Sequence, residues 1–417
     1  MSKLIRVALL AAFVTVLPAH ADTLRNGFSV ERLGRVDALV DTYINDGRVA
    51  GAVVLVLRDG KPVYERAAGW ADKEAGRKMS MDTQFRIASQ TKALTSVAVL
   101  QLMEEGKLAI NDPAGKYIPT FAKTTVAARE EGAKEPVISP AKRAITIKDL
   151  LTHTSGMDYG TSAAVAAMYE AKGLGPAAGF GWYFADKNEP ICDSMERLGT
   201  LPFVSQPGEA WVYGYNTDVL GCIIEKASGV SLDEFFRSHI TGPLGMKDTH
   251  FFLPPEKRER LATVYGSDAN GKAVRQANDA KGQGHYVDGP RKSFSGGAGL
   301  VSTARDYATF LEALRNGGEY GKVRILSPHA VKLMTTNQVG TLRGQNANGF
   351  GYGFDTQDRY GPGMDSVGAW GWGGAYGSSY KVDPAERLTI VLMIQLLPNN
   401  TDFRDKFPAS IYQALLD

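Results

Sequence analysis

The chain contains a serine followed three positions later by a lysine in three places. These pairs are Ser89 with Lys92, Ser139 with Lys142, and Ser378 with Lys381. A serine hydroxyl becomes a nucleophile when a neighbouring base removes its proton. A lysine is such a base when its amine is neutral, and both burial and the positive end of a helix favour the neutral form. The spacing alone therefore indicates acyl-transfer chemistry only where local structure brings the two side chains together in a dry site.

Local structure favours one of the three pairs. Ser139 precedes a proline in the charge-rich segment 123–143, which we expect to be a solvated loop. Ser378 and its lysine lie in an expected strand, where residues three apart point to opposite faces. Ser89 and Lys92 begin an apolar helix over 89–105, where residues three apart share a face. The alternative, Ser89 as a helix cap with Lys92 at the surface, stays open on spacing alone.

Two further segments could complete such a site. Residues 206–216 turn at Pro207 and Gly208 and bring Tyr213 to the start of an expected helix, so Tyr213 is a candidate second proton carrier. Residues 371–377 are glycine-rich, and glycines allow a strand edge to approach a substrate and offer a backbone N–H to an oxyanion. The alternatives are an ordinary packed tyrosine and a simple turn.

The elements around these segments alternate in type along the chain. Apolar spacing predicts helices over 30–45, 147–151, 217–228, 232–240, 304–315 and 403–416, and strands over 51–57, 62–68, 378–382 and 388–394. Strands near both ends predict an α/β (α+β) fold in a single domain over 22–417. Its α/β part is built from about 22–110 and 296–417, and a mainly helical insertion spans about 111–295.

Composition narrows the function classes. The 417 residues include 47 basic and 45 acidic side chains, a balance that argues against nucleic-acid binding. Histidines and cysteines show no metal-ligand spacing, and there is no phosphate-binding or dinucleotide motif, so we expect no metal and no organic cofactor. Cys192 and Cys222 could form a disulfide, but Cys222 lies in an apolar helical run where a buried free thiol is equally natural.

The first 21 residues are typical of a secretory signal peptide. A basic start is followed by an apolar run over 7–17 and the small-residue site Ala19-His20-Ala21, which predicts cleavage after Ala21. The run is too short for a transmembrane helix. We therefore expect an exported protein, periplasmic or secreted, with no stable membrane anchor.

Taken in order, the motifs resemble the serine β-lactamase-like superfamily, which includes class C β-lactamases, DD-peptidases and family-VIII carboxylesterases. Six strings carry the resemblance: FRIASQTK (85–92), LLTHTSGM (150–157), PGEAWVY (207–213), GPLGMKDT (242–249), GLVSTA (299–304) and WGG (372–374). The resemblance implies a β-lactamase/transpeptidase-like fold with an antiparallel sheet flanked by helices.

The resemblance also implies roles for individual residues. Ser89 would be the acylated nucleophile, Lys92 its base and Tyr213 the tyrosine of the second motif. The backbone N–H groups of Ser89 and Ala375 would form the oxyanion hole. Residues of the second and third motifs would contact substrate, namely Tyr215, Trp372, Gly373 and Gly374. His153 falls in a string that is usually a structural turn in this family.

Two departures from the family pattern bear on the substrate. The second motif usually ends in asparagine, and Tyr215 stands there instead; the third usually begins with lysine or histidine, and Trp372 stands there. An indole carries no positive charge and cannot form an ion pair with a carboxylate, so a neutral acyl ester should suit this site better than an anionic peptide mimic. We therefore expect a serine carboxylesterase acting on short-chain acyl esters. The alternatives are a class C-like β-lactamase, a D-amino-acid-specific peptidase or amidase, and a non-catalytic penicillin-binding or sensor protein.

Overall fold

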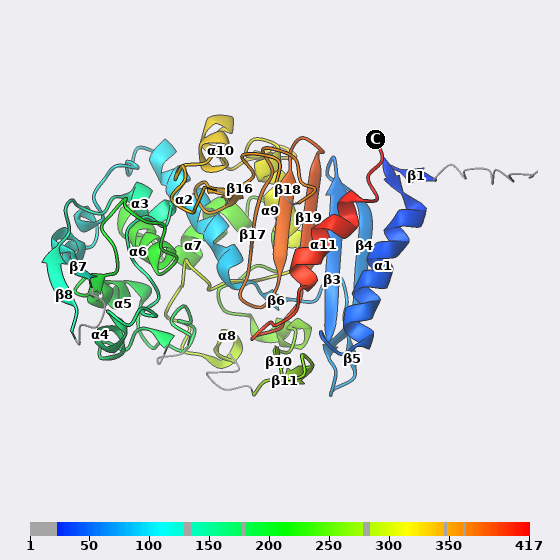
Figure 1. The fold of residues 1–417 in the computed structure, drawn as a ribbon, viewed down its shortest axis with the longest axis horizontal. Coiled ribbons are helices and arrows are strands. Elements are labelled where there is room, and N and C mark those ends of the chain that lie inside the picture. Colours follow the sequence, from blue (N-terminus) through cyan, green and yellow to red (C-terminus); the bar gives the residue numbers. More distant parts are fainter. Residues whose placement is uncertain (1–22, 129–134, 177–179, 278–283, 346–347, 362) are drawn as a thin grey trace, which may run out of the picture.

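The computed structural model describes residues 23–128, 135–176, 180–277, 284–345, 348–361 and 363–417 (Figure 1). The expected signal peptide, 1–21, lies outside the described residues. The helices are α1 (Val30–Asn45), α2 (Thr91–Glu104), α3 (Ile147–Leu151), α4 (Ala166–Glu170), α5 (Ile191–Leu198), α6 (Asn216–Ser228), α7 (Leu232–Phe236), α8 (His285–Asp288), α9 (Ala304–Arg315), α10 (Pro328–Met334) and α11 (Phe403–Tyr412).

A sheet of eight antiparallel strands forms one half of the molecule, in the order β15-β16-β17-β18-β19-β3-β4-β5. These strands are β3 (Gly51–Arg58), β4 (Lys61–Asp72), β5 (Arg77–Lys78), β15 (Gly349–Phe350), β16 (Asp355–Thr356), β17 (Trp370–Gly373), β18 (Ser379–Asp383) and β19 (Leu388–Met393). The remaining short strands are β1 (Leu24–Arg25), β2 (Phe28–Ser29), β6 (Phe85–Arg86), β7 (Thr125–Ala128), β8 (Val137–Pro140), β9 (Pro202–Phe203), β10 (Tyr265–Ser267), β11 (Ala273–Arg275), β12 (Val301–Ser302), β13 (Glu319–Tyr320) and β14 (Val323–Arg324).

The two ends of the chain meet in the middle of this sheet. β3, from the N-terminal part, pairs with β19, from the C-terminal part, with Val54 opposite Leu392. β3 continues into β4 through a tight turn in which Asp59 and Gly60 both have positive φ, 53° and 71°. Such φ values match the right-handed twist of the flanking strands. The blue β3 and the orange β19 therefore lie side by side in Figure 1. This pairing agrees with the prediction that strands near both ends of the chain build one sheet.

Helices cover both faces of the sheet. Side chains alternate along β3, so that Val54 and Val56 contribute to one apolar cluster while Val53 and Leu55 contribute to another. The first cluster includes residues of α1 and α11, and the second includes residues of α2 and α9. This alternation is the normal consequence of a strand buried on two faces.

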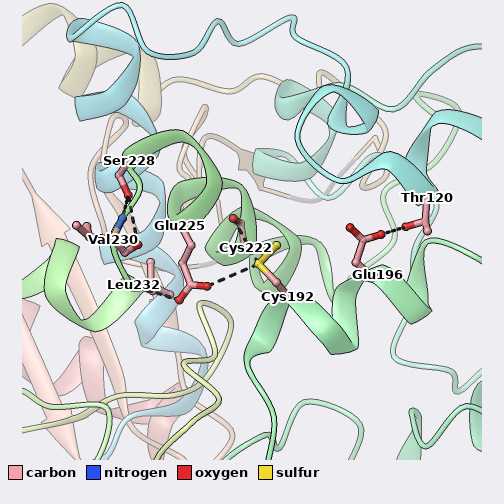
Figure 2. Close-up of a disulfide and its surroundings, with 8 residues drawn as sticks. All are labelled: Thr120, Cys192, Glu196, Cys222, Glu225, Ser228, Val230 and Leu232. Carbon is pink, nitrogen blue, oxygen red and sulfur yellow. Dashed lines mark hydrogen bonds between the residues drawn. A yellow bond between two sulfur atoms is a disulfide. The ribbon is translucent and has the colours of Figure 1, made fainter.

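The helical part lies beside the sheet and is built around α2 and α6 (Figure 1). A disulfide joins Cys192 of α5 to Cys222 of α6, with Cα atoms 5.0 Å apart (Figure 2). The sequence had left this pairing open. The bond closes a segment of 30 residues and fixes α5 against α6.

Two local predictions were wrong. The segment 123–143 is not simply a loop, because β7 and β8 form an antiparallel pair and β7 also pairs in parallel with β9. The predicted helix 232–240 is α-helical only over α7 and continues as a π-helical turn, Arg237–Thr241. In the first case β7 and β8 pair with each other inside the segment, and β9, which is distant in sequence, adds a third strand beside Thr125 and Val126.

Candidate active site

Ser89 lies on a short 3-10 turn, Ala88–Gln90, that leads directly into α2. The helix predicted from position 89 therefore begins two residues later. Ala88 has φ 42°, a left-handed conformation that costs a non-glycine residue about 1–2 kcal/mol. The strain is held in place because β6 pairs with β12 and the N–H of Ile87 donates to the carbonyl of Leu300 at 3.0 Å. The chain thus turns sharply to present Ser89.

Lys92, on the first turn of α2, is only 1% exposed. Its amine donates hydrogen bonds to Ser89 Oγ at 3.2 Å, to the Tyr159 hydroxyl at 3.2 Å and to the Gly297 carbonyl at 2.8 Å. These three contacts occupy all the donors of an ammonium group. A neutral amine would donate two of them and accept the proton of the Ser89 hydroxyl, so the arrangement can serve both protonation states.

Two tyrosines flank this amine in different ways. The amine lies 4.7 Å from the centre of the Tyr213 ring, whereas the Tyr213 hydroxyl accepts a hydrogen bond from Trp372 Nε1 at 3.3 Å. The hydroxyl that bonds Lys92 belongs to Tyr159. Burial, with smaller contributions from Tyr213 and Asp218, raises the pKa of Tyr159 well above its usual value, so this phenol keeps its proton.

The sequence analysis did not identify Tyr159. The available signal was its position two residues after the LLTHTSGM string, which was interpreted as a structural turn. A lone tyrosine gives no indication of which distant amine it will meet.

The glycine-rich third motif lies beside the Ser89 turn. A Cβ on Gly374 would stand 2.4 Å from the carbonyl oxygen of Ile87, so only glycine permits this approach. The backbone N–H groups of Ser89 and Ala375 donate no hydrogen bond to any group in the described part of the chain. Because both residues line the same cavity, these two free donors can stabilise a negative oxygen there.

The cavity in front of Ser89 has a volume of about 720 Å³. Its wall is made of aromatic and charged side chains together with the strand edge of the third motif. The residues that line it include Ser89, Tyr159, Trp182, Tyr213, Arg343, Asp355, Trp372, Gly373, Gly374, Ala375, Lys381, Arg404, Asp405 and Phe407. A space of this size accommodates a small organic substrate.

The Ser89–Lys92 pair beside this cavity occurs in a chain with clear similarity to known proteins. The family model described as Beta-lactamase matches residues 36–414. The chain belongs to this family. It is 34% identical over 373 residues to Protein Rv1367c of Mycobacterium tuberculosis (85% of this chain, 87% of that protein) and 32% identical over 375 residues to Esterase EstB of Burkholderia gladioli (86% and 89%).

The fold agrees with this membership. The solved structure of EstCE1, described as a hydrolase with promiscuous acyltransferase activity, superposes with a TM-score of 0.75 at 26% identity and covers 93% of this chain and 99% of its own. The protein is thus a serine hydrolase or acyltransferase of the β-lactamase fold, and the expected antiparallel sheet with flanking helices is confirmed.

Tyr215 does not reach the site. It is fully buried and does not line the cavity, and its hydroxyl accepts a hydrogen bond from the Gly175 N–H at 2.9 Å. The expectation that Tyr215 contacts substrate is therefore wrong. Its position at the start of α6 turns the side chain into the aromatic core, beside Tyr159 and Phe184.

His153 is part of the support beneath Tyr213. Its ring centre lies 4.7 Å from that of Tyr213, and its Nδ1 is 3.0 Å from the amide nitrogen of Asn216. Burial, followed by the nearby charges of Lys92 and Arg343, lowers the pKa of His153 well below its usual value. A neutral, enclosed imidazole suits the structural turn that the resemblance implies for its string.

Asp218 lies behind the Lys92 amine. It is fully buried on α6 and accepts hydrogen bonds from Ser295 Oγ at 2.5 Å and from the Gly297 N–H at 3.1 Å. Burial raises the pKa of Asp218, and the positive charge of Lys92 opposes that shift. Asp218 thereby holds the glycine whose carbonyl receives the Lys92 amine, a role that the sequence analysis also missed.

The other two serine–lysine pairs differ from this arrangement. Ser139 is exposed on β8, and Lys142 pairs with Glu209 at 2.6 Å. The Lys381 amine is taken by Asp365 at 2.7 Å. Neither lysine is placed to activate its serine.

Two searches of the described residues gave negative results. No cluster of three or more His, Cys, Asp or Glu side chains there has an arrangement suited to a metal ion. Within the same residues, every helix is too short or too polar to cross a bilayer.

Proposed function

We propose that this protein is a carboxylesterase that acts on short-chain acyl esters through an acyl-enzyme at Ser89. The observation that carries the proposal is the buried Lys92 amine, hydrogen-bonded to Ser89 Oγ at 3.2 Å beside a cavity that both Ser89 and Tyr213 line. The similarity to Esterase EstB supports the ester preference.

In the first step, Lys92 takes the Ser89 proton while Oγ attacks the ester carbonyl carbon. The carbonyl oxygen becomes negative and is received by the N–H groups of Ser89 and Ala375. Collapse of this intermediate breaks the bond to the leaving oxygen, which takes a proton as the alcohol departs. Tyr213 supplies that proton from its hydroxyl, which accepts a hydrogen bond from the Trp372 indole at 3.3 Å. The proton that Lys92 took from Ser89 then passes to Tyr213, so that both groups return to their starting states.

In the second step, the same groups act on water. Lys92 and Tyr213 remove a proton from a water molecule, which attacks the acyl carbon, and the proton returns to Ser89 Oγ as the acid leaves. Because the two groups share protons, the pH–rate profile reports the pair rather than one residue. No metal or organic cofactor is needed for either step.

The proposal is tested with Ser89→Ala in purified mature protein. Hydrolysis of p-nitrophenyl butyrate is expected to fall to background while the thermal transition remains in place. Intact-mass analysis after a fluorophosphonate probe is expected to show one adduct in the wild type and none in the variant. Unchanged turnover in Ser89→Ala rejects Ser89 as the nucleophile, and a cephalosporin or D-Ala-D-Ala peptide that far outpaces the ester rejects the substrate class.

The site of action belongs to the same proposal. We infer that the chain is exported after cleavage behind Ala21, because residues 1–21 have the pattern of a signal peptide. The Cys192–Cys222 disulfide supports this inference, since such bonds persist in oxidising compartments.

A further inference from the structure

Positive charge lies close to the position where Trp372 replaces the cation of the third motif. Arg343, Lys381 and Arg404 all line the cavity in front of Ser89. The Lys381 amine is held by Asp365 at 2.7 Å and is neutralised there. The two arginines are more available, and the sequence could not reveal this because they are distant from the motif along the chain.

Arg404, on the first turn of α11, reaches over the strand edge of the third motif. Its Nη1 lies 3.0 Å from the position that a Cβ on Gly373 would occupy. Its nearest acid is Asp405 at 3.8 Å, and the two side chains are 48% and 76% exposed. The Arg404 guanidinium makes no hydrogen bond to any group in the described ranges, so its donors face the cavity and solvent.

Arg343 stands on the other side of the motif, against aromatic rings. Its guanidinium lies 4.6 Å from the centre of the Trp211 ring and 5.8 Å from that of Trp372. Nη1 donates to two backbone carbonyls and to Asp355. Within the described residues, Nε and Nη2 have no hydrogen-bond partner. A planar guanidinium fixed on one edge and open on the other is suited to a carboxylate.

The acids that face these arginines do not cancel them fully. Asp355 lies in the same wall, and burial raises its pKa while the charges of Arg343, Lys381 and Arg404 oppose that shift. One partly buried carboxylate is therefore shared among several cations. Asp405 is mostly in solvent, where its interaction with Arg404 is weak.

We propose that Arg404, assisted by Arg343, binds a carboxylate carried by the substrate, so that the preferred substrates are esters bearing a negative charge. This inference rests on the proposed esterase function and changes its expected substrate. The loss of the motif cation at Trp372 predicted neutral esters. In the tertiary structure, Arg404 of α11 and Arg343 of the segment before β15 place positive charge in the same cavity.

The experiment compares matched esters that differ only in one charge. One pair carries it on the acyl chain, mono-p-nitrophenyl glutarate against its methyl ester. The other carries it on the alcohol, 3-acetoxybenzoate against methyl 3-acetoxybenzoate. In at least one pair, kcat/KM for the carboxylate is expected to exceed that for the neutral ester by about tenfold at low salt, the size of one charge-assisted hydrogen bond. The preference should shrink as ionic strength rises.

Variants assign the preference to these residues. The charge ratio is kcat/KM for the carboxylate ester divided by kcat/KM for its neutral partner. Arg404→Gln is expected to abolish most of this ratio, and Arg404→Glu to reverse it. Adding Arg343→Gln to Arg404→Gln is expected to lower the ratio further. Arg35→Gln is the control, because it removes one exposed cation on α1, outside the cavity. It should leave the ratio unchanged.

The outcomes separate the two proposals. A ratio near one in both pairs, or a ratio that survives Arg404→Gln and Arg404→Glu, overturns the carboxylate site while the esterase function stands. Absence of hydrolysis of all four esters together with absence of a fluorophosphonate adduct overturns the esterase function itself. Because each ratio is measured on one enzyme preparation, partial misfolding of a variant cancels.

Discussion

Replacing Gly297 with alanine is expected to impair catalysis while leaving the fold in place. Gly297 is held between two buried groups, since its N–H donates to Asp218 and its carbonyl accepts from Lys92. A Cβ on Gly297 would lie 2.5 Å from Asp218 Oδ2. Asp218 cannot simply rotate away, because its other oxygen is bonded to Ser295 and it is fully buried. The Gly297 backbone must therefore move.

The geometry gives the size of the effect. An ordinary contact begins at 3.4 Å, so relief of the 2.5 Å clash requires a movement of 0.9 Å. A backbone shift of this size lengthens the Lys92–Gly297 bond from 2.8 Å to at most roughly 3.7 Å, where the bond is lost. Loss of a hydrogen bond to a charged group is worth about 1.5–3 kcal/mol. We expect kcat to fall roughly 10- to 150-fold, with KM changed little because substrate does not contact Gly297.

The assay measures kcat per active site, with the sites counted by fluorophosphonate titration. Gly34→Ala is the matched control, because Gly34 lies exposed on α1 and a Cβ there meets no atom within 4 Å. It should leave kcat unchanged. A Gly297→Ala protein with wild-type kcat per titrated site, or one whose loss is entirely a loss of folded protein, would refute the argument that the Gly297 carbonyl positions Lys92.

Three further outcomes follow from particular contacts. Tyr159→Phe deletes the hydroxyl that bonds the Lys92 amine and is expected to lower kcat roughly 10-fold or more, with KM within about a factor of three. Tyr213→Phe should lower kcat at least as much, about 100-fold. Wild-type steady-state kinetics in either variant would contradict the role assigned to that tyrosine. Reduction of the Cys192–Cys222 disulfide, which closes 30 residues, should lower the free energy of unfolding by roughly 3–4 kcal/mol. Denaturant titration of the wild type with and without reductant checks this, and the double alanine variant, which reductant should not affect, is the control. Equal stability of the oxidised and the reduced wild type contradicts the prediction. Burial lowers the pKa of His250 to about 4. The unfolded chain therefore binds one more proton than the folded chain between about pH 6.5 and pH 4. The free energy of unfolding should fall as pH decreases through that window, and denaturant titrations should show a smaller fall in His250→Gln.

Local sequence was sufficient where the decisive interactions are local. Helix α1 was predicted with its observed bounds, and α9 likewise, because their apolar spacing and capping residues lie within the element. The strands predicted over 51–57 and 62–68 form and are joined by a turn at Asp59 and Gly60, since these residue types accept the positive φ that such a turn requires. The choice of Ser89 and Lys92 among three similar pairs depended only on which element each pair occupies.

Tertiary structure decided which side chains meet around that pair. The amine of Lys92 contacts Tyr159 and Gly297, which are 67 and 205 residues away, and no periodicity relates such positions. Tyr215, the last residue of the second motif, instead turns into the core. The positive charge in the cavity comes from Arg404 and Arg343 rather than from the motif. Short-range spacing fixes the direction of a side chain on its own element, whereas the groups it faces are set by the packing of elements distant in the chain.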